Sequence, residues 1–176
     1  MRYADGLSVD DEVHIAAAPG KVWKLVTDIG LPARLSPELQ RTEWLEGATG
    51  PELGASFAGY NRHPAAGEWR TVSHVVGLDP ERRFAWAVTD PENRYGGGPA
   101  DPAHPLATWA FELRPEEGGT VLRHSARLGP APSGLSAVID RMPEREEELL
   151  TMRLGELRTG IRATLEGVKR LAEEQA

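Results

Sequence analysis

The sequence contains no cysteine among its 176 residues, which excludes disulfides, thiolate nucleophiles and cysteine-ligated zinc. It has no apolar run near the length of about 18 residues that a membrane helix needs, and no apolar segment at its N-terminus. We therefore expect no membrane insertion and a cytoplasmic location. Lys and Arg number 20 against 27 Asp and Glu, for a net charge of −7. No basic stripe stands out, so we expect no nucleic-acid partner.

Motifs for cofactors and metals are missing as well. The chain has no GxSxG sequence, no phosphate-binding loop and no Rossmann glycine pattern. No two of its five histidines have the spacing of a helical or strand metal site. We expect no cofactor and no metal. The glycine run at 96–98 is most simply part of a flexible loop.

A long amphipathic helix is the clearest feature that is present. Its apolar residues recur every three or four positions, which is typical of one stripe along an α-helix. Pro143 suits the first helical turn, where its missing N–H costs nothing. The sequence predicts a helix beginning near Met142, within a helical region of about 136–173. The stripe consists of Leu150, Leu154, Leu157, Ile161, Leu165, Val168 and Leu171.

Seven shorter segments alternate with period two and predict strands. They are residues 12–17, 39–46, 55–62, 68–78, 83–89, 108–114 and 120–128. Two short helices, at 19–29 and 31–36, follow the first strand. Short turns between consecutive strands favour an antiparallel meander. We expect one domain over 1–176, with residues 1–10 flexible and a Gly/Pro-rich loop at 90–106.

This order resembles the helix-grip fold of the SRPBCC or START-like superfamily, and its polyketide cyclase/dehydrase subfamily in particular. The resemblance is carried by APGKVWKLVTDI at 18–29, LSPE at 35–38 and EWLEGATGPELGASFAGYNRH at 43–63. It continues through 68–86, 108–120 and the terminal helix. One departure is Arg34-Leu35, where relatives often carry Trp before SPE. The resemblance implies an α+β fold in which a curved antiparallel sheet of about seven strands grips the long helix and leaves a cavity.

Strand alternation predicts which side chains face that cavity. Three tryptophans share the inward face, and they either stack on a flat ligand or simply fill the core. Asn61, Thr71 and Ser73 are inward polar residues. Asn61 and Ser73 either orient a carbonyl or hydroxyl group of a ligand or bond to water or to the backbone. The predicted ligand-binding set is Phe57, Gly59, Asn61, Trp69, Thr71, Ser73, Phe84, Trp86, Tyr95, Trp109, Phe111, Leu154, Leu157 and Ile161.

His124 is the only inward group that titrates near neutrality, which makes it the candidate for acid/base catalysis. The alternative is a structural histidine whose ring a neighbouring strand or helix end satisfies. Tyr95 lies in the 90–106 loop and is a candidate gate if that loop acts as a lid.

Three functions remain open. The first is a protein that binds a hydrophobic small molecule, such as a lipid or a polyketide. The second is an aromatase/cyclase or dehydratase that acts on a polyketide-like chain by acid/base chemistry. The third is a protein-interaction module. The sequence leaves a monomer and a homodimer equally open.

Overall fold

Seven strands form one antiparallel sheet in the order β1-β7-β6-β5-β4-β3-β2. The computed structural model describes residues 1–174. Strands β2 to β7 form the predicted meander, and β1 returns to pair with β7. The strands are β1 (Ser8–Ile15), β2 (Leu39–Trp44), β3 (Ser56–His63), β4 (Gly67–Asp79), β5 (Arg83–Thr89), β6 (Ala107–Glu116) and β7 (Gly119–Leu128).

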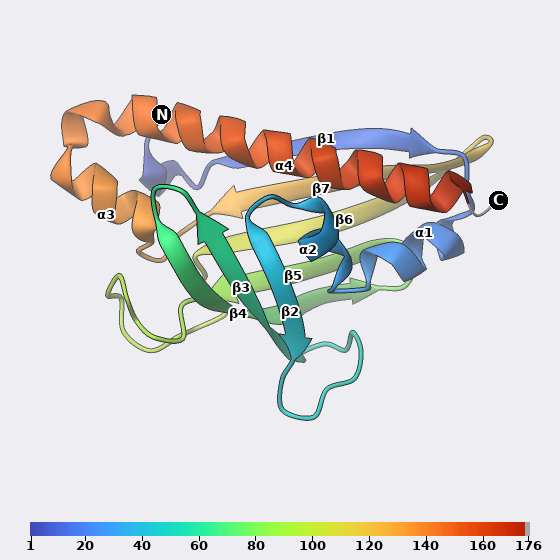
Figure 1. Cartoon of the computed structure of the whole chain (residues 1–176), viewed down its shortest axis with the longest axis horizontal. Helices are drawn as coiled ribbons and strands as arrows, with labels where there is room; N and C mark the ends of the chain where they lie inside the picture. The colour runs from blue at the N-terminus through green and yellow to red at the C-terminus, as the bar shows by residue number, and fades with distance from the viewer. Residues whose placement is uncertain (175–176) are drawn as a thin grey trace.

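The helices cover one face of this sheet. Between β1 and β2 lie α1 (Pro19–Val26) and α2 (Leu31–Leu35), and the 29-residue helix α4 (Glu146–Glu174) runs along β1 (Figure 1). Shorter elements flank them: the 3-10 turns η1 (Tyr3–Asp5) and η2 (Pro143–Arg145), and helix α3 (Gly134–Arg141). The predicted helix-grip architecture is confirmed.

The start of the long helix differs from the prediction. Helix α3 ends at Arg141, and Met142 has φ −138° and ψ 61°, outside the helical region. A residue that precedes proline is sterically disfavoured in the α conformation, and here Pro143 opens a separate 3-10 turn. Helix α4 therefore begins at Glu146, and the helical region is two helices joined by a bend. Residues 175–176, the end of the domain predicted over 1–176, lie outside the described residues.

The first strand begins earlier than the predicted residue 12. Before it, the Tyr3 hydroxyl donates to the Ala131 carbonyl at 2.7 Å, and the Tyr3 N–H donates to Glu146 at 2.8 Å. Strand β1 begins at Ser8, which pairs with Arg127 of β7. Consecutive acidic residues in the sequence obscured the alternation around the buried Val9.

One apolar core joins the sheet to the helices. Leu150, Ile161, Leu165 and Val168 of α4 are each no more than 2% exposed, so the predicted stripe is the face that packs on the sheet. Two irregularities in the ladder, between Leu39 and Arg41 and between Val75 and Gly77, interrupt regular pairing. Bulges of this kind increase the local twist and bend of a sheet. They help the sheet to curve around α4.

Candidate functional site

An aromatic cluster occupies the middle of the sheet face that α4 covers, which we call the concave face. Trp86 of β5 lies directly opposite Trp109 of β6, and their rings are stacked with centroids 6.5 Å apart at 8°. Phe84 and Phe111 form the next pair in the same register. Because directly opposite residues of an antiparallel pair point to the same side, strand pairing alone assembles this cluster.

His124 lies inside the aromatic cluster. It pairs with Phe111 across β6 and β7, and the two rings stack with centroids 4.0 Å apart at 11°. The Trp109 ring is 5.2 Å away, and His124 itself is 4% exposed. The histidine that the sequence placed inward is thus packed among three aromatic rings of the cluster, including Trp86.

The hydrogen bonding of His124 determines its chemistry. Its Nδ1 lies 2.9 Å from the Ala110 carbonyl oxygen, which only accepts, so Nδ1 carries the proton and donates. Burial lowers the pKa of His124 from 6.5 to about 4, and the bond to Ala110 offsets part of that shift. The ring is therefore neutral at pH 7, with a lone pair on Nε2.

Several polar atoms of this face have no partner within the protein. Across residues 1–174, no side-chain nitrogen or oxygen is both fully buried and without a hydrogen bond. His124 Nε2 and the indole N–H groups of Trp86 and Trp109 form no such bond in that same range, so each keeps contact with solvent. Unpaired polar atoms on an otherwise apolar surface are the kind of groups that orient a ligand.

The remaining inward polar residues lie nearer the end of β3. The Asn61 side-chain amide donates to the Thr71 hydroxyl at 3.5 Å. Gly59 lies directly opposite Thr71, and a Cβ there would be 3.1 Å from Thr71 Oγ1 and 3.4 Å from Leu39 Cδ1. Ser73 follows on the same face of β4 and is 3% exposed. These residues extend the polar side of the concave face beyond the aromatic cluster.

Burial divides the predicted ligand-binding residues into two groups. Trp86, Trp109 and Leu154 are half-buried and pack against the core, so they have surface to offer a ligand. Five further apolar residues of the predicted set are buried in the core, each at most 7% exposed: Phe57, Phe84, Phe111, Leu157 and Ile161.

Trp69 and Tyr95 lie apart from the aromatic cluster. Trp69 precedes Val75, the partner of Trp86, by six positions on β4, or roughly 20 Å along a strand. The predicted platform of three tryptophans is therefore one stacked pair and one separate residue. Tyr95 contacts the start of α3, because a Cβ on Gly134 would lie 3.3 Å from its hydroxyl. The 90–106 loop is thus folded against α3.

Sequence reasoning missed two parts of this region. Trp44 of β2 lies opposite Phe57 and meets its ring edge-on at 5.5 Å. The second part is an ion-pair network, in which Arg153 of α4 bonds Glu38 and Glu156 at 2.9 Å each. His63 at the end of β3 reaches Glu156 at 3.4 Å. The network links α4 to Glu38, which precedes β2, and to the end of β3, and no local sequence pattern indicates it.

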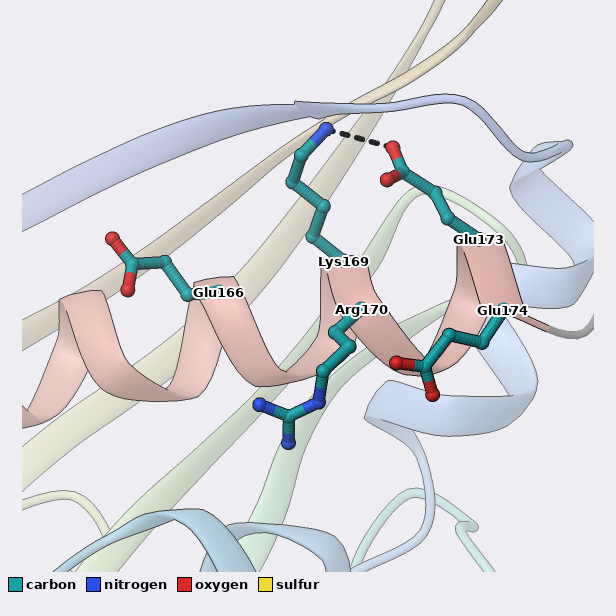
Figure 2. Close-up of a pocket in the computed structure, with 5 residues that line it drawn as sticks. All are labelled: Glu166, Lys169, Arg170, Glu173 and Glu174. Atoms are coloured by element: carbon teal, nitrogen blue, oxygen red, sulfur yellow. Dashed lines mark hydrogen bonds and ion pairs between the residues drawn. The ribbon is translucent and has the colours of Figure 1, made fainter.

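A hollow at the C-terminal end of α4 lies apart from the concave face. It measures about 510 Å³ and is lined only by charged residues of the helix, which Figure 2 shows. Lys169 donates to Glu173 at 2.7 Å and to the His14 carbonyl at 2.8 Å, and Glu173 accepts from the Ala16 N–H at 2.9 Å. These bonds fasten the helix to the end of β1, and the hollow shares no residue with the concave face.

Within residues 1–174, no three His, Asp or Glu side chains are grouped as metal ligands. None of the helices in this range has the length and apolarity to cross a membrane.

A curved antiparallel sheet wrapped on a long helix, with an aromatic inner face, defines a protein of the helix-grip class. The chain belongs to the family described as polyketide cyclase / dehydrase and lipid transport, whose model matches residues 6–173. No curated protein matches the sequence.

Solved structures agree with this assignment. The polyketide-cyclase-like protein Cgl2372 from Corynebacterium glutamicum is 32% identical, with a TM-score of 0.62, over 97% of this chain and 93% of that one. The di-domain ARO/CYC proteins StfQ, of the steffimycin biosynthetic pathway, and BexL, of the BE-7585A pathway, share the fold. StfQ is 16% identical with a TM-score of 0.66, covering 96% of this chain. BexL is 20% identical with a TM-score of 0.67, covering 95%. This chain spans about half of each, 51% and 50%.

Proposed function

We propose that the protein binds a hydrophobic small molecule, such as a lipid or polyketide, between the concave face and α4. The observation that carries this proposal is the neutral His124, whose Nε2 forms no hydrogen bond within residues 1–174 and is surrounded by aromatic rings. An apolar ligand with one hydroxyl would place its rings or chain against Trp86 and Trp109 and donate to Nε2. Carbonyl groups of the ligand would accept from the indole N–H groups.

The electrostatics favour binding over acid/base catalysis. A general base works best when its pKa lies near the operating pH. The pKa of His124 is lowered to about 4 by burial, so at neutral pH its lone pair is a weak base but a good hydrogen-bond acceptor. His124 therefore orients the ligand in this proposal rather than removing a proton from it.

A cyclase or dehydratase is the second candidate. The family description names both activities along with lipid transport, and two structural neighbours are ARO/CYC proteins of biosynthetic pathways. In that function the concave face would fold a polyketide-like chain, and a bound substrate would have to raise the pKa of His124 toward neutrality. A protein-interaction module lacks a comparable supporting observation.

Native mass spectrometry of the protein purified from its own host tests the proposal. We expect a small molecule that is released on denaturation, and its identity then provides the probe for titration by tryptophan fluorescence. An empty protein whose fluorescence does not respond to a panel of fatty acids and aromatic polyketides would contradict binding.

His124→Asn separates the two candidates. An asparagine amide is placed to replace Nδ1 as donor to the Ala110 carbonyl but offers nothing at the position of Nε2. We expect weaker binding of the identified ligand, by about tenfold for one lost hydrogen bond. Ser125→Asn, on the opposite face of the same strand, is the matched control and should bind normally. Turnover of that ligand by the unaltered protein, lost in His124→Asn while binding persists, would favour the enzyme.

A further inference from the structure

A second hollow lies beside the ends of β2, β3 and β4, and none of its lining residues belongs to α4. It measures about 380 Å³ and is formed by the outer ends of β2, β3 and β4 with the beginning of the 90–106 loop. In Figure 1 that loop lies beside the β3–β4 hairpin, and Arg94 joins them by donating to the Glu68 carbonyl at 3.2 Å. Its lining residues are Gln40, Arg41, Tyr60, Asn61, Arg62, Glu68, Trp69, Arg70, Glu92 and Arg94.

Positive charge is concentrated in this hollow. Four of its ten lining residues are arginines and two are glutamates, in a protein whose net charge is −7. Arg62 is engaged by Glu68 through two bonds, at 3.1 and 2.6 Å. Arg70 and Arg94, in contrast, form no ion pair within 4.0 Å with any of residues 1–174, although the charge of Arg70 contributes to lowering the pKa of the nearby Glu43. Two guanidinium groups therefore border the hollow without a carboxylate in direct ion-pair contact.

Strand register builds the centre of the hollow. Arg41, Tyr60 and Arg70 lie directly opposite one another across β2, β3 and β4, so a tyrosine stands between two arginines. The Arg41 guanidinium stacks over the Tyr60 ring at 3.7 Å, which holds it in place by a cation–π contact. Strand alternation directs these side chains away from the concave face, which Gly59 and Thr71 share.

We propose that this hollow is a second binding site, for a small molecule that carries a phosphate group. A phosphate close to −2 matches the two arginines without a carboxylate in direct ion-pair contact, Arg70 and Arg94. Guanidinium groups bind phosphate oxygens through paired N–H donors, which gives both energy and orientation. The volume of about 380 Å³ accommodates the phosphate and a ring or short chain attached to it. The hollow shares Asn61 and Trp69 with the ligand-binding set predicted for the concave face, but Tyr60 and Arg70 alternate with them along β3 and β4 and point to the opposite face of the sheet.

Phenyl phosphate and phenol are the probes that test this site, followed by NMR of backbone amides in the full chain. We expect phenyl phosphate to shift the amides around Tyr60 and Arg70, with an affinity that falls as salt is added. Phenol should produce no such shifts. In the double variant Arg70→Gln, Arg94→Gln the affinity should fall at least about tenfold, since two charge-assisted bonds are lost. Arg158→Gln, an exposed residue of α4, is the matched control and should bind normally.

Three results would overturn the proposal. One is the absence of shifts with phenyl phosphate, and another is equal affinity in the double variant. The third is sedimentation with phosphatidic-acid vesicles without any binding of phenyl phosphate, which would assign the arginines to a lipid surface instead. Inorganic phosphate that shifts the same amides would support recognition of the phosphate group itself.

Discussion

The two faces of β3 and β4 differ sharply although they are made from alternate residues of the same strands. On the concave face, Gly59, Thr71 and Ser73 adjoin a packed aromatic cluster and a neutral histidine. On the outer face, Tyr60 lies between two arginines. Burial on the concave face favours the neutral form of a titratable side chain, whereas exposure to water on the outer face allows arginines to remain charged. A strand with period two thus supplies two chemically unrelated surfaces from a single stretch of sequence.

The largest expected effect is on the free energy of unfolding, and it tests the difference between the two faces by removing one aromatic ring from each. Phe111 is 1% exposed and stacks on His124, so Phe111→Ala leaves a cavity and should lower the free energy of unfolding by about 3–5 kcal/mol. Tyr60→Ala removes a ring of similar size from the outer face, where the expected loss is about 1 kcal/mol or less. Urea denaturation of both variants measures the difference. Equal losses would mean that the outer face is packed as tightly as the core.

An intermediate effect concerns the pH dependence of stability. Burial lowers the pKa of His124 to about 4 in the folded protein, whereas the unfolded chain has the ordinary value near 6.5. Between these values the unfolded state binds more protons, so the free energy of unfolding falls as the pH falls. The contribution is fully present above about pH 6.5 and is lost by about pH 4, amounting to ~3 kcal/mol.

Denaturation at a series of pH values, with His124→Asn for comparison, measures this contribution. The difference in stability between the two proteins should change across that range, because asparagine does not titrate and the other groups are common to both. Ser125→Asn keeps His124 and should follow the unaltered protein. Parallel curves for the unaltered protein and His124→Asn would show that His124 titrates normally and is not held neutral.

The concave face was easier to predict from the sequence than the outer face, for a physical reason. Alternation of apolar and polar residues within one strand indicates the buried side, which is why Trp86, Phe111 and His124 were placed inward correctly. The arginine site depends on which residues of three strands lie opposite one another. That register is fixed by a bulge near Arg41 and by the hairpin geometry, and neither follows from composition or period.

The start of α4 illustrates a different limit. Apolar periodicity predicted the stripe correctly, because residues such as Leu150 and Ile161 are spaced for one helix face. It did not predict the bend, since Pro143 is compatible both with the first turn of a helix and with a break before it. The choice depends on how α3 packs, which is a tertiary effect. Likewise, Arg153 and Glu38 are separated by 115 residues, so only the folded chain shows that they pair.

The smallest expected effect is a change in the pKa of Glu43, which concerns the outer face alone. The pKa of Glu43 is lowered, first by the hydrogen bond from the Tyr60 hydroxyl and further by the charge of Arg41. The bond is 2.7 Å long. Tyr60→Phe removes that donor and leaves a ring for Arg41 to stack on, so the pKa of Glu43 should rise toward its ordinary value while the fold is unchanged. A carboxyl-detected NMR titration measures the pKa, and Arg41→Gln should produce a smaller rise. If Arg41→Gln has the larger effect, charge rather than the tyrosine hydroxyl controls this carboxylate, and the outer face is organised mainly by its arginines.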